Sequence, residues 1–382
     1  MFLDTQTDAP NLLYGVRKEV MLNAAWECSD NVAGVRSNQG SSCFVNSLLQ
    51  LLQPMRGFRL CLGGHQLYCR RRAGHCVLCA LHADLVLQTN GDRISNSHFT
   101  RLVRSGCIGA DFSGASQCDA HEFFVAVIRS FNQAECDRAA KVGGELDTAT
   151  LAERVQLRPV LSDLVWGIVV RHRLYCRNCD RASDRLSYLD GLVLPLPYDE
   201  SPRSLEDLLL AYCKPRSGRD AECPAGEGIP CSPSTARITQ QDLFEKEPPV
   251  LILLLNRRRR DMYDHKKLHN DVAFPEVLSS LRSGDYHFAA AIRHQGDTPQ
   301  SGHYLMNRWL GESRYAEINC LPPGERRIRW EDVQVQGKEV YILAYVRLAL
   351  REGVGDGSVD TPYKRDRTAT ELFGGRMFDA AP

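Results

Sequence analysis

The spacing of hydrophobic residues changes near the middle of the chain, and this change constrains the fold more than any other feature of the sequence. In the first half, apolar residues recur three and four positions apart, which is typical of amphipathic helices. Two such faces are Val45, Leu48, Leu49 and Leu52, and Ala120, Phe123, Phe124 and Val127. In the second half, six short apolar or alternating runs between turn residues are expected to be strands: 192–197, 250–255, 286–292, 304–309, 314–318 and 340–347. A helical lobe followed by a sheet lobe predicts an α+β fold with a cleft where the lobes join.

The two ends of the chain differ in composition from the region between them. Residues 1–30 carry little hydrophobic pattern and are expected to form an N-terminal extension. Residues 349–382 are rich in Gly, Asp and Arg with few aliphatic residues, which predicts a flexible tail. No segment repeats at a fixed period, so a solenoid is excluded. The folded domain is therefore expected to span 31–348.

Charge and cysteine content argue against several classes of protein. The 47 basic and 47 acidic residues balance, so we expect neither nucleic acid nor a membrane as a partner. The basic run 257–260 is expected to be a solvated turn, and the apolar run 250–255 is far shorter than the roughly 20 residues of a membrane helix. Fifteen cysteines, an odd number in a long chain, together with a start that lacks an apolar signal segment, predict a cytoplasmic and/or nuclear protein.

One cysteine stands where a reactive thiol is expected. Cys43 follows a Gly-Ser-Ser turn and begins an apolar-periodic helix, which Ser41 or Ser42 is expected to cap. The unpaired N–H groups and the dipole of a helix N-terminus favour a thiolate, so a lowered pKa is expected for Cys43. The alternative is a buried cysteine that packs as a small hydrophobic residue.

A base for this thiol is offered by a predicted hairpin. His303 lies near the start of one strand, the chain turns at 310–313, and the second strand ends at Asn319. Residues near the outer ends of such strands can touch, so the Asn319 oxygen could accept from the imidazole and direct its other nitrogen to a thiol.

The segment Asn-Gln-Gly-Ser-Ser-Cys-Phe-Val-Asn-Ser-Leu-Leu-Gln at 38–50 resembles the cysteine box of the ubiquitin-specific proteases. Gly-His-Tyr at 302–304, followed by Tyr-Ala-Glu-Ile-Asn at 315–319, resembles their histidine box. Six further blocks occur in the order typical of this family, at 117–124, 175–179, 192–197, 249–253, 272–275 and 341–345. The resemblance covers about residues 32–347, and ordered blocks over such a length are very improbable by chance.

The resemblance implies a papain-like cysteine protease with a helical thumb, β fingers and a β palm, whose partners are ubiquitin and ubiquitinated proteins. It implies a deubiquitinase that needs no cofactor for catalysis. Cys43 matches the nucleophile of the family, His303 the general base and Asn319 the residue that orients the base. Asn38 matches the side chain that donates to the oxyanion.

Three further residues match positions that contact the ubiquitin tail. Asp119 and Glu122 match acidic positions, and carboxylates suit the arginines that precede the two terminal glycines of ubiquitin. The alternative for both is a solvated face of a thumb helix. His294 matches a histidine upstream of the catalytic one, with a tail-binding or structural role.

Cysteine spacing also suggests a structural zinc ion. Cys176 and Cys179 form one half of a zinc site, and the family often supplies a second Cys-x-x-Cys at the fingertips. Here the nearest pair is Cys223 and Cys231, which are separated by seven residues, and Cys213 is a further candidate. A second group comprises Cys69, Cys76 and Cys79, with His75 and His82 nearby, and its cysteines are interpreted as core residues.

One departure from the family pattern bears on activity. Cys320 stands where the family usually has Asp after the orienting residue, so the surroundings of the histidine lose an acid. This departure leaves two alternatives to a deubiquitinase: a ubiquitin-binding scaffold with weak or lost catalysis, and a protease for a ubiquitin-like modifier.

Overall fold

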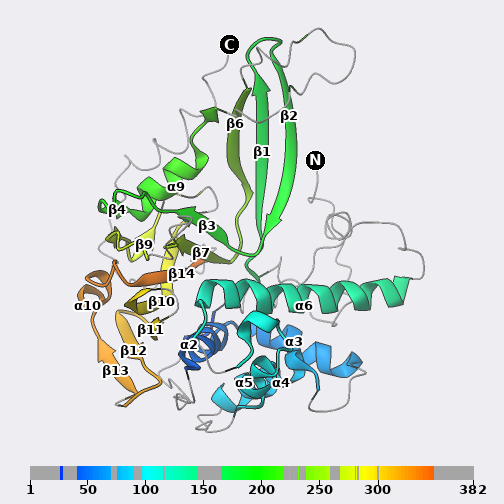
Figure 1. Ribbon diagram of the computed structural model, residues 1–382, viewed down its shortest axis with the longest axis vertical. Coiled ribbons are helices and arrows are strands. Elements are labelled where there is room, and N and C mark those ends of the chain that lie inside the picture. The colour runs from blue at the N-terminus through cyan, green and yellow to red at the C-terminus, as the bar shows by residue number, and fades with distance from the viewer. Residues whose placement is uncertain are drawn as a thin grey trace, which may run out of the picture.

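The computed structural model describes residues 26–28, 41–69, 75–89, 97–114, 117–143, 165–217, 223, 231, 238–258, 267–279, 281, 284–298, 301–322 and 324–347. They form three regions, which we call the thumb, the palm and the fingers (Figure 1). The predicted tail lies outside these residues, as does all of the predicted extension except 26–28. None of the helices in the described ranges is long and apolar enough to cross a membrane.

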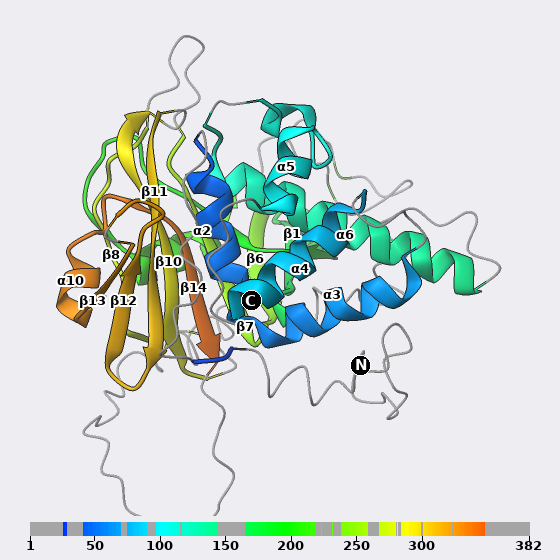
Figure 2. The same ribbon diagram turned by 90° about the horizontal axis from the view of Figure 1, so that it is seen from below.

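The thumb is helical. It consists of α2 (Cys43–Leu52), α3 (Arg56–Tyr68), α4 (Val77–Thr89), α5 (His98–Arg104), the 3-10 turn η1 (Ala110–Phe112) and α6 (Ala120–Gly143). All ten residues of α2 are buried, because this helix lies between the palm sheet and the other thumb helices (Figure 2). The Phe44 ring packs edge-on against Phe123 of α6, with ring centroids 5.0 Å apart. The two predicted helical faces are therefore confirmed as the core of the thumb.

The palm is a sheet of eight strands, in the order β13-β12-β11-β10-β14-β7-β3 with β9 paired to β10. Its strands are β3 (Leu192–Pro195), β7 (Val250–Asn256), β9 (Val277–Leu278), β10 (Tyr286–Thr298), β11 (Ser301–Gly311), β12 (Arg314–Ile318), β13 (Glu325–Ile328) and β14 (Val340–Arg347). Ile342 and Ala344 of β14 face the thumb core, and Leu343 and Tyr345 face a second core behind the sheet. Both faces of the central strands are covered, which explains their unbroken apolar runs. The six predicted strands are confirmed, although β10 extends six residues beyond its predicted end.

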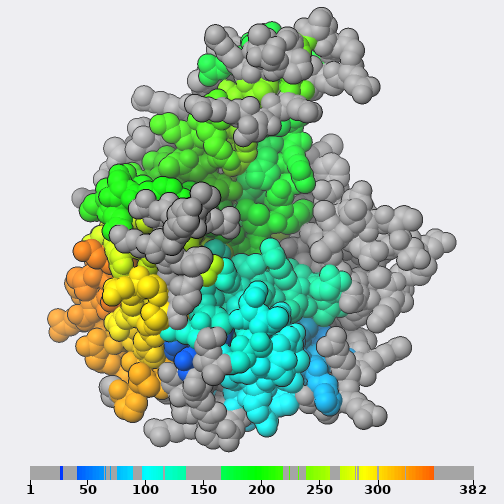
Figure 3. Space-filling view, in the orientation of Figure 1, coloured from blue at the N-terminus to red at the C-terminus, as the bar shows by residue number. Residues whose placement is uncertain are grey.

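The fingers rise above the line where palm and thumb meet, as the green surface in Figure 3 shows. They are a four-stranded sheet in the order β2-β1-β6-β5, built from β1 (Ile168–Cys176), β2 (Arg181–Leu189), β5 (Arg216–Ser217) and β6 (Ile238–Lys246). At their base lie α9 (Leu205–Cys213) and the pair β4 (Arg203–Ser204) and β8 (Val272–Ala273), while α10 (Trp330–Gln334) borders the palm. The first six residues of β2 are exposed on both sides of the strand. Its sequence therefore shows no alternation of apolar and polar residues that would predict a strand.

Arg257 corrects the prediction of a solvated turn at 257–260. It directly follows β7 and is 1% exposed. Its guanidinium donates to four backbone carbonyl oxygens, those of Leu268, Asn270, Gly337 and Val340. A buried cation with its N–H groups paired ties three segments of the palm together. Residues 259 and 260 of the same run lie outside the described residues.

Candidate active site

Cys43 begins α2, as predicted, but the predicted serine cap is not formed. Ser42 occupies the N-cap position, and its side chain makes no capping hydrogen bond. The first N–H groups of the helix are therefore left for other acceptors. The backbone N–H groups of Cys43, Phe44 and Tyr304 all stabilise the charged form of the Cys43 sulfur.

The expectation of a lowered pKa for Cys43 is wrong. Burial raises the pKa of this thiol above its usual range, because a thiolate loses more solvation than a thiol when water is removed. The three backbone N–H groups and the charge of Arg104 lower the pKa, but their sum is smaller than the effect of burial. Cys43 is 2% exposed and rests as a thiol, so it needs a base to become a nucleophile.

His303 and Asn319 make the contact that the hairpin predicted. The antiparallel register pairs Met306 of β11 with Ile318 of β12, which places Asn319 opposite Leu305 and diagonal to His303 on the same face. The Asn319 Oδ1 atom lies 2.8 Å from His303 Nε2. The backbone N–H of Leu321 donates to the same Oδ1 at 2.9 Å, which fixes the amide with its oxygen toward the ring. His303 Nε2 therefore carries a proton, and Nδ1 is the nitrogen that can accept one.

Tyr304 links the base to the nucleophile. Its backbone N–H stabilises the Cys43 thiolate, and His303 is the residue directly before it on β11. The Tyr304 hydroxyl accepts from the backbone N–H of Ala120 at 3.2 Å, which joins β11 to the first residue of α6. The hydrogen bonds of the described residues include none directly between Cys43 and His303. Such bonds commonly tighten only when substrate binds.

Gly302 is the position where the backbone next to His303 admits no side chain. Its φ is +145°, and a Cβ atom there would lie 2.2 Å from the Gln295 carbonyl oxygen and 2.7 Å from His294 Nε2. We expect Gly302→Ala to displace His303 and to lower the turnover rate by about 10²-fold, since a shift near 1 Å can cost that much. Steady-state hydrolysis of the substrate proposed below measures this.

The matched control is Gly284→Ala. Gly284 also has a positive φ, +109°, but nothing lies within 4 Å of the Cβ position. Backbone strain without a clash at the base should leave turnover nearly unchanged. Equal losses in both variants would contradict the role assigned to the close approach at Gly302.

Asp119 and Glu122 both contact a basic side chain of the palm. Asp119 is 4% exposed, and its Oδ1 accepts from the backbone N–H of His121 at 2.8 Å at the start of α6. Its Oδ2 lies 3.4 Å from Nε of Arg258, whose guanidinium also pairs with Glu122. The two predicted tail-binding carboxylates therefore share one cation from the palm.

His294 lies inside the palm. It pairs with Tyr304 across β10 and β11 and is 0% exposed, and Lys267 Nζ lies 3.3 Å from its Nδ1. Burial, with a smaller contribution from the charge of Lys267, lowers the pKa of His294 to about 3. The neutral ring lies beside Tyr304 on the strand that carries His303, and the tail-binding or structural role of His294 stays a prediction.

Cys320 stands close to the base, as its position after Asn319 requires. Its Sγ lies 4.0 Å from His303 Nε2. Burial raises the pKa of Cys320 to about 11, so it remains a neutral thiol. It borders a small cavity together with Asn46 and Ser47 of α2 and Asn319. No negative charge is supplied to the imidazole at this position.

The sequence predicts one oxyanion donor, and the structure places a further amide side chain at the Cys43 sulfur. Asn38, the predicted one, lies outside the described residues. Gln117, which was not predicted, places its Nε2 3.7 Å from Cys43 Sγ and can donate to it. The signal for Gln117 was its place in the block at 117–124, two residues before Asp119.

The four predicted metal ligands meet at the tip of the fingers. Cys176 ends β1 and Cys179 lies in the turn that follows it, and their sulfurs lie 3.6 Å from Cys231 and 3.5 Å from Cys223, respectively. All four sulfur atoms lie within 4.8 Å of one another. A tetrahedral zinc ion with Zn–S bonds of about 2.3 Å needs sulfurs about 3.8 Å apart, so this donor set fits zinc. Cys213, the further candidate, is not in the group.

Comparisons with known proteins agree with this geometry. A family model described as ubiquitin carboxyl-terminal hydrolase matches residues 35–345. Ubiquitin carboxyl-terminal hydrolase 23 of Arabidopsis thaliana is 24% identical over 324 residues, which cover 81% of this chain and 35% of that protein. Ubiquitin carboxyl-terminal hydrolase 17-like protein A of Mus musculus is 25% identical over 381 residues, which cover 94% of this chain and 66% of that protein. The chain thus spans about one third to two thirds of the length of these curated relatives.

A solved structure shares the fold. The SAGA Ubp8/Sgf11/Sus1/Sgf73 DUB module bound to ubiquitin aldehyde contains a chain that matches with a TM-score of 0.65 and 20% identity. The match covers 84% of this chain and 70% of that chain. The α+β arrangement of thumb, palm and fingers is therefore the fold of that protein as well.

Proposed function

Because this chain belongs to the ubiquitin carboxyl-terminal hydrolase family, we propose that it is a deubiquitinase, which hydrolyses the peptide or isopeptide bond after the C-terminal glycine of ubiquitin. One observation carries the proposal: β11 contacts the Cys43 sulfur through the backbone N–H of Tyr304 and carries, one residue earlier, a histidine held by Asn319 at 2.8 Å. A thiol, a base and a residue that orients the base are the parts that nucleophilic acyl transfer requires.

The proposed reaction has two stages. His303 Nδ1 takes the proton of the Cys43 thiol as the sulfur attacks the glycine carbonyl carbon, and backbone N–H groups at the start of α2, with Gln117, stand near the resulting oxyanion. The C–N bond then breaks, and His303 gives its proton to the departing amine. In the second stage His303 takes a proton from water, the hydroxide attacks the thioester, and the proton returns to the Cys43 sulfur as ubiquitin leaves.

Recognition of the ubiquitin tail is assigned to the carboxylates at the start of α6. Asp119 and Glu122 hold the guanidinium of Arg258, and this contact supports the proposal that the pair can bind an arginine. An arginine of the tail would replace Arg258 in this role.

The proposal is tested with ubiquitin that carries a C-terminal electrophile. The purified chain should form a covalent adduct, and peptide mapping should locate it on Cys43, because Cys43 is the thiol that His303 can deprotonate. The same preparation should release a fluorogenic group from the C-terminus of ubiquitin. An adduct on the exposed thiol of Cys107, or none, would count against the assignment.

A second candidate, a ubiquitin-binding scaffold with weak catalysis, is favoured by the neutral thiol of Cys320 beside His303. It predicts measurable binding of ubiquitin without turnover of the fluorogenic substrate. Probes built on ubiquitin-like modifiers, used side by side with the ubiquitin probe, decide whether the chain serves a related modifier instead.

We also propose that the fingers hold a structural zinc ion through Cys176, Cys179, Cys223 and Cys231, whose convergence supports it. When bound, the ion would fix the fingertip by coordination and take no part in the reaction. We expect Cys176→Ser to lower the zinc content by about one equivalent per chain, measured by elemental analysis. Cys213→Ser is the matched control, because Cys213 lies near the base of the fingers but outside the group. Unchanged zinc in Cys176→Ser would refute the site.

The bounds of the catalytic unit and the cellular compartment of the protein are proposals that rest on the sequence. We place the unit at 31–348, which the family match at 35–345 supports, and the protein in the cytoplasm and/or nucleus. Activity of the fragment 31–348 and imaging of the tagged full chain test these two statements.

A further inference from the structure

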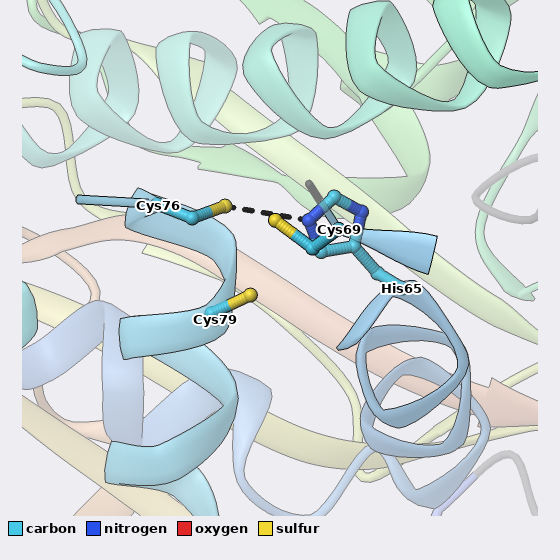
Figure 4. A group of neighbouring side chains, drawn as sticks. All are labelled: His65, Cys69, Cys76 and Cys79. Atoms are coloured by element: carbon cyan, nitrogen blue, oxygen red, sulfur yellow. Dashed lines mark hydrogen bonds between the residues drawn. The ribbon is translucent and has the colours of Figure 1, made fainter. Parts of the chain in front are cut away.

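A second group of metal-binding side chains lies in the thumb, apart from the active site and the fingers. His65 stands in the last turn of α3 and Cys69 directly after it, while Cys76 precedes α4 and Cys79 lies in its first turn. Figure 4 shows these four side chains pointing toward one another between the two helices. We propose that they form a site that binds one zinc ion.

The distances suit a tetrahedral ion. His65 Nε2 lies 3.3 Å from Cys76 Sγ, and the four ligand atoms all lie within 4.8 Å of one another. Zinc with one imidazole and three thiolates needs nitrogen and sulfur atoms about 3.6 Å apart and sulfur atoms about 3.8 Å apart. Small movements of the side chains would therefore close the coordination shell.

The sequence spacing suits the site as well. His65 lies in the last turn of α3 and Cys69, four residues later, is the residue that ends it, so both stand at the same end of the helix. Cys76 and Cys79 form a Cys-x-x-Cys unit at the start of α4, a spacing that lets both sulfurs reach one ion. A pair from each helix end gives the His-x-x-x-Cys and Cys-x-x-Cys halves of a closed structural site.

The interpretation of these cysteines as core residues does not account for their arrangement. Cys76 belongs to the thumb core, Cys69 and Cys79 are only half-buried against it, and none of the three forms a disulfide. A cysteine that packs as a hydrophobic residue has no need of an imidazole directed at its sulfur, yet His65, 9% exposed, is directed at Cys76. Four soft donors that converge in this way are the expected surroundings of a zinc ion.

The histidine of the group is not one of the two that the sequence suggested. His75 is exposed, and the ring of His82 lies against α3, with its Nε2 3.2 Å from the Cβ position of Gly63. His65 is farther away in sequence from the Cys-x-x-Cys unit, but the antiparallel packing of α3 on α4 brings it back.

The ion would have a structural role, since three cysteines and one histidine leave no open position for a substrate. It would join the end of α3 to the start of α4 across residues 70–74. These two helices lie beside α2, the helix that carries Cys43 (Figure 2). Loss of the ion is therefore expected to loosen the thumb without removing any catalytic group.

The test measures zinc in the full chain and in variants, independently of activity. With both sites filled, the wild-type chain should contain about two equivalents, and Cys76→Ser and Cys79→Ser about one. Cys61→Ser is the matched control: Cys61 is a buried cysteine of α3 outside the group, and this variant should keep the wild-type content.

The double variant Cys176→Ser/Cys179→Ser decides the question without altering the thumb. Zinc that remains in this protein supports the thumb site, whatever the fingers bind, and X-ray absorption should show three sulfur ligands and one nitrogen ligand. The proposal is overturned if this variant contains no zinc, or if its zinc has another ligand set. These measurements remain decisive if Cys76→Ser fails to fold, and a failure of the proposed hydrolase activity would leave them unchanged.

Discussion

Replacing His303 with alanine is expected to lower kcat for release of a group from the ubiquitin C-terminus by about 10⁴-fold or more. The reason is the resting state of the nucleophile. Burial raises the pKa of Cys43, so almost no thiolate exists at neutral pH unless a base removes the proton during attack. The residual rate would come from binding and from the oxyanion donors alone. Steady-state and single-turnover kinetics at saturating substrate measure this change.

One companion variant and one change of pH locate the cause of the loss. Asn319→Ala keeps the imidazole but removes the Oδ1 atom 2.8 Å from its Nε2, so its loss should be smaller than that of His303→Ala. Raising the pH should partly restore the His303→Ala variant, because hydroxide then generates the thiolate that the missing base would have formed. A His303→Ala variant that retains most of the wild-type kcat would remove His303 from the mechanism.

Replacing Arg257 with alanine is expected to reduce the free energy of unfolding by about 3 kcal/mol or more. The change removes a buried cation that donates to four backbone carbonyl oxygens and leaves those oxygens without partners in the palm. Burial lowers the pKa of Arg257 to about 10, which leaves it charged at neutral pH. Denaturation by urea or heat, followed by circular dichroism, measures the loss.

Arg258→Ala is the control for this prediction. Arg258 is the next residue, and its guanidinium is partly exposed and pairs with the exposed Glu122, where an ion pair contributes about 1 kcal/mol or less. Its other partner, Asp119, keeps the backbone N–H groups of α6 when Arg258 is removed. Arg257→Lys should recover only part of the stability, since an ammonium cannot reach the carbonyls of Leu268 and Gly337 at once with the geometry of a guanidinium. Equal effects of Arg257→Ala and Arg258→Ala would contradict the structural role of Arg257.

Most of the palm and the core of the thumb could be predicted from the sequence, because burial leaves a pattern there. β12 and β14 have the predicted bounds, and the contact between His303 and Asn319 follows from the register of a single hairpin. Local spacing determines such features. The family resemblance supplied the roles of residues that lie far apart in sequence.

The fingers could not be predicted in this way. β2 and much of β1 and β6 are exposed or only partly buried, so their sequences carry polar residues on both sides. Ion pairs such as that of Arg173 on β1 with Asp184 on β2 join these strands. Charged residues also occur in solvated loops, so they do not indicate a strand. Whether these segments form a sheet depends on the pairing of β1 with β6, and these two strands lie too far apart in sequence for any short window to contain both.

The expectations for the pKa of Cys43 and for the exposure of Arg257 were wrong because both side chains are buried. The helix N-terminus does favour a thiolate at Cys43, but desolvation outweighs it, and the sequence does not state how deeply a helix is buried. The same holds for Arg257, where a charged residue beside an apolar strand was expected to face water. His65 joined a cysteine group because two helices pack side by side, which is also a tertiary effect.

The guanidinium of Arg258 already pairs with the two carboxylates that are proposed to bind a cation of the tail. Asp119 and Glu122 share this one cation, so an incoming cation that displaces it gains only the difference between two sets of ion pairs. A peptide with a neutral residue at this point gains nothing and leaves Arg258 where it is. On the proposed function, selectivity would work as an exchange: a tail whose cation pairs with Asp119 and Glu122 more weakly than Arg258 does would not displace Arg258, and no steric gate would be required.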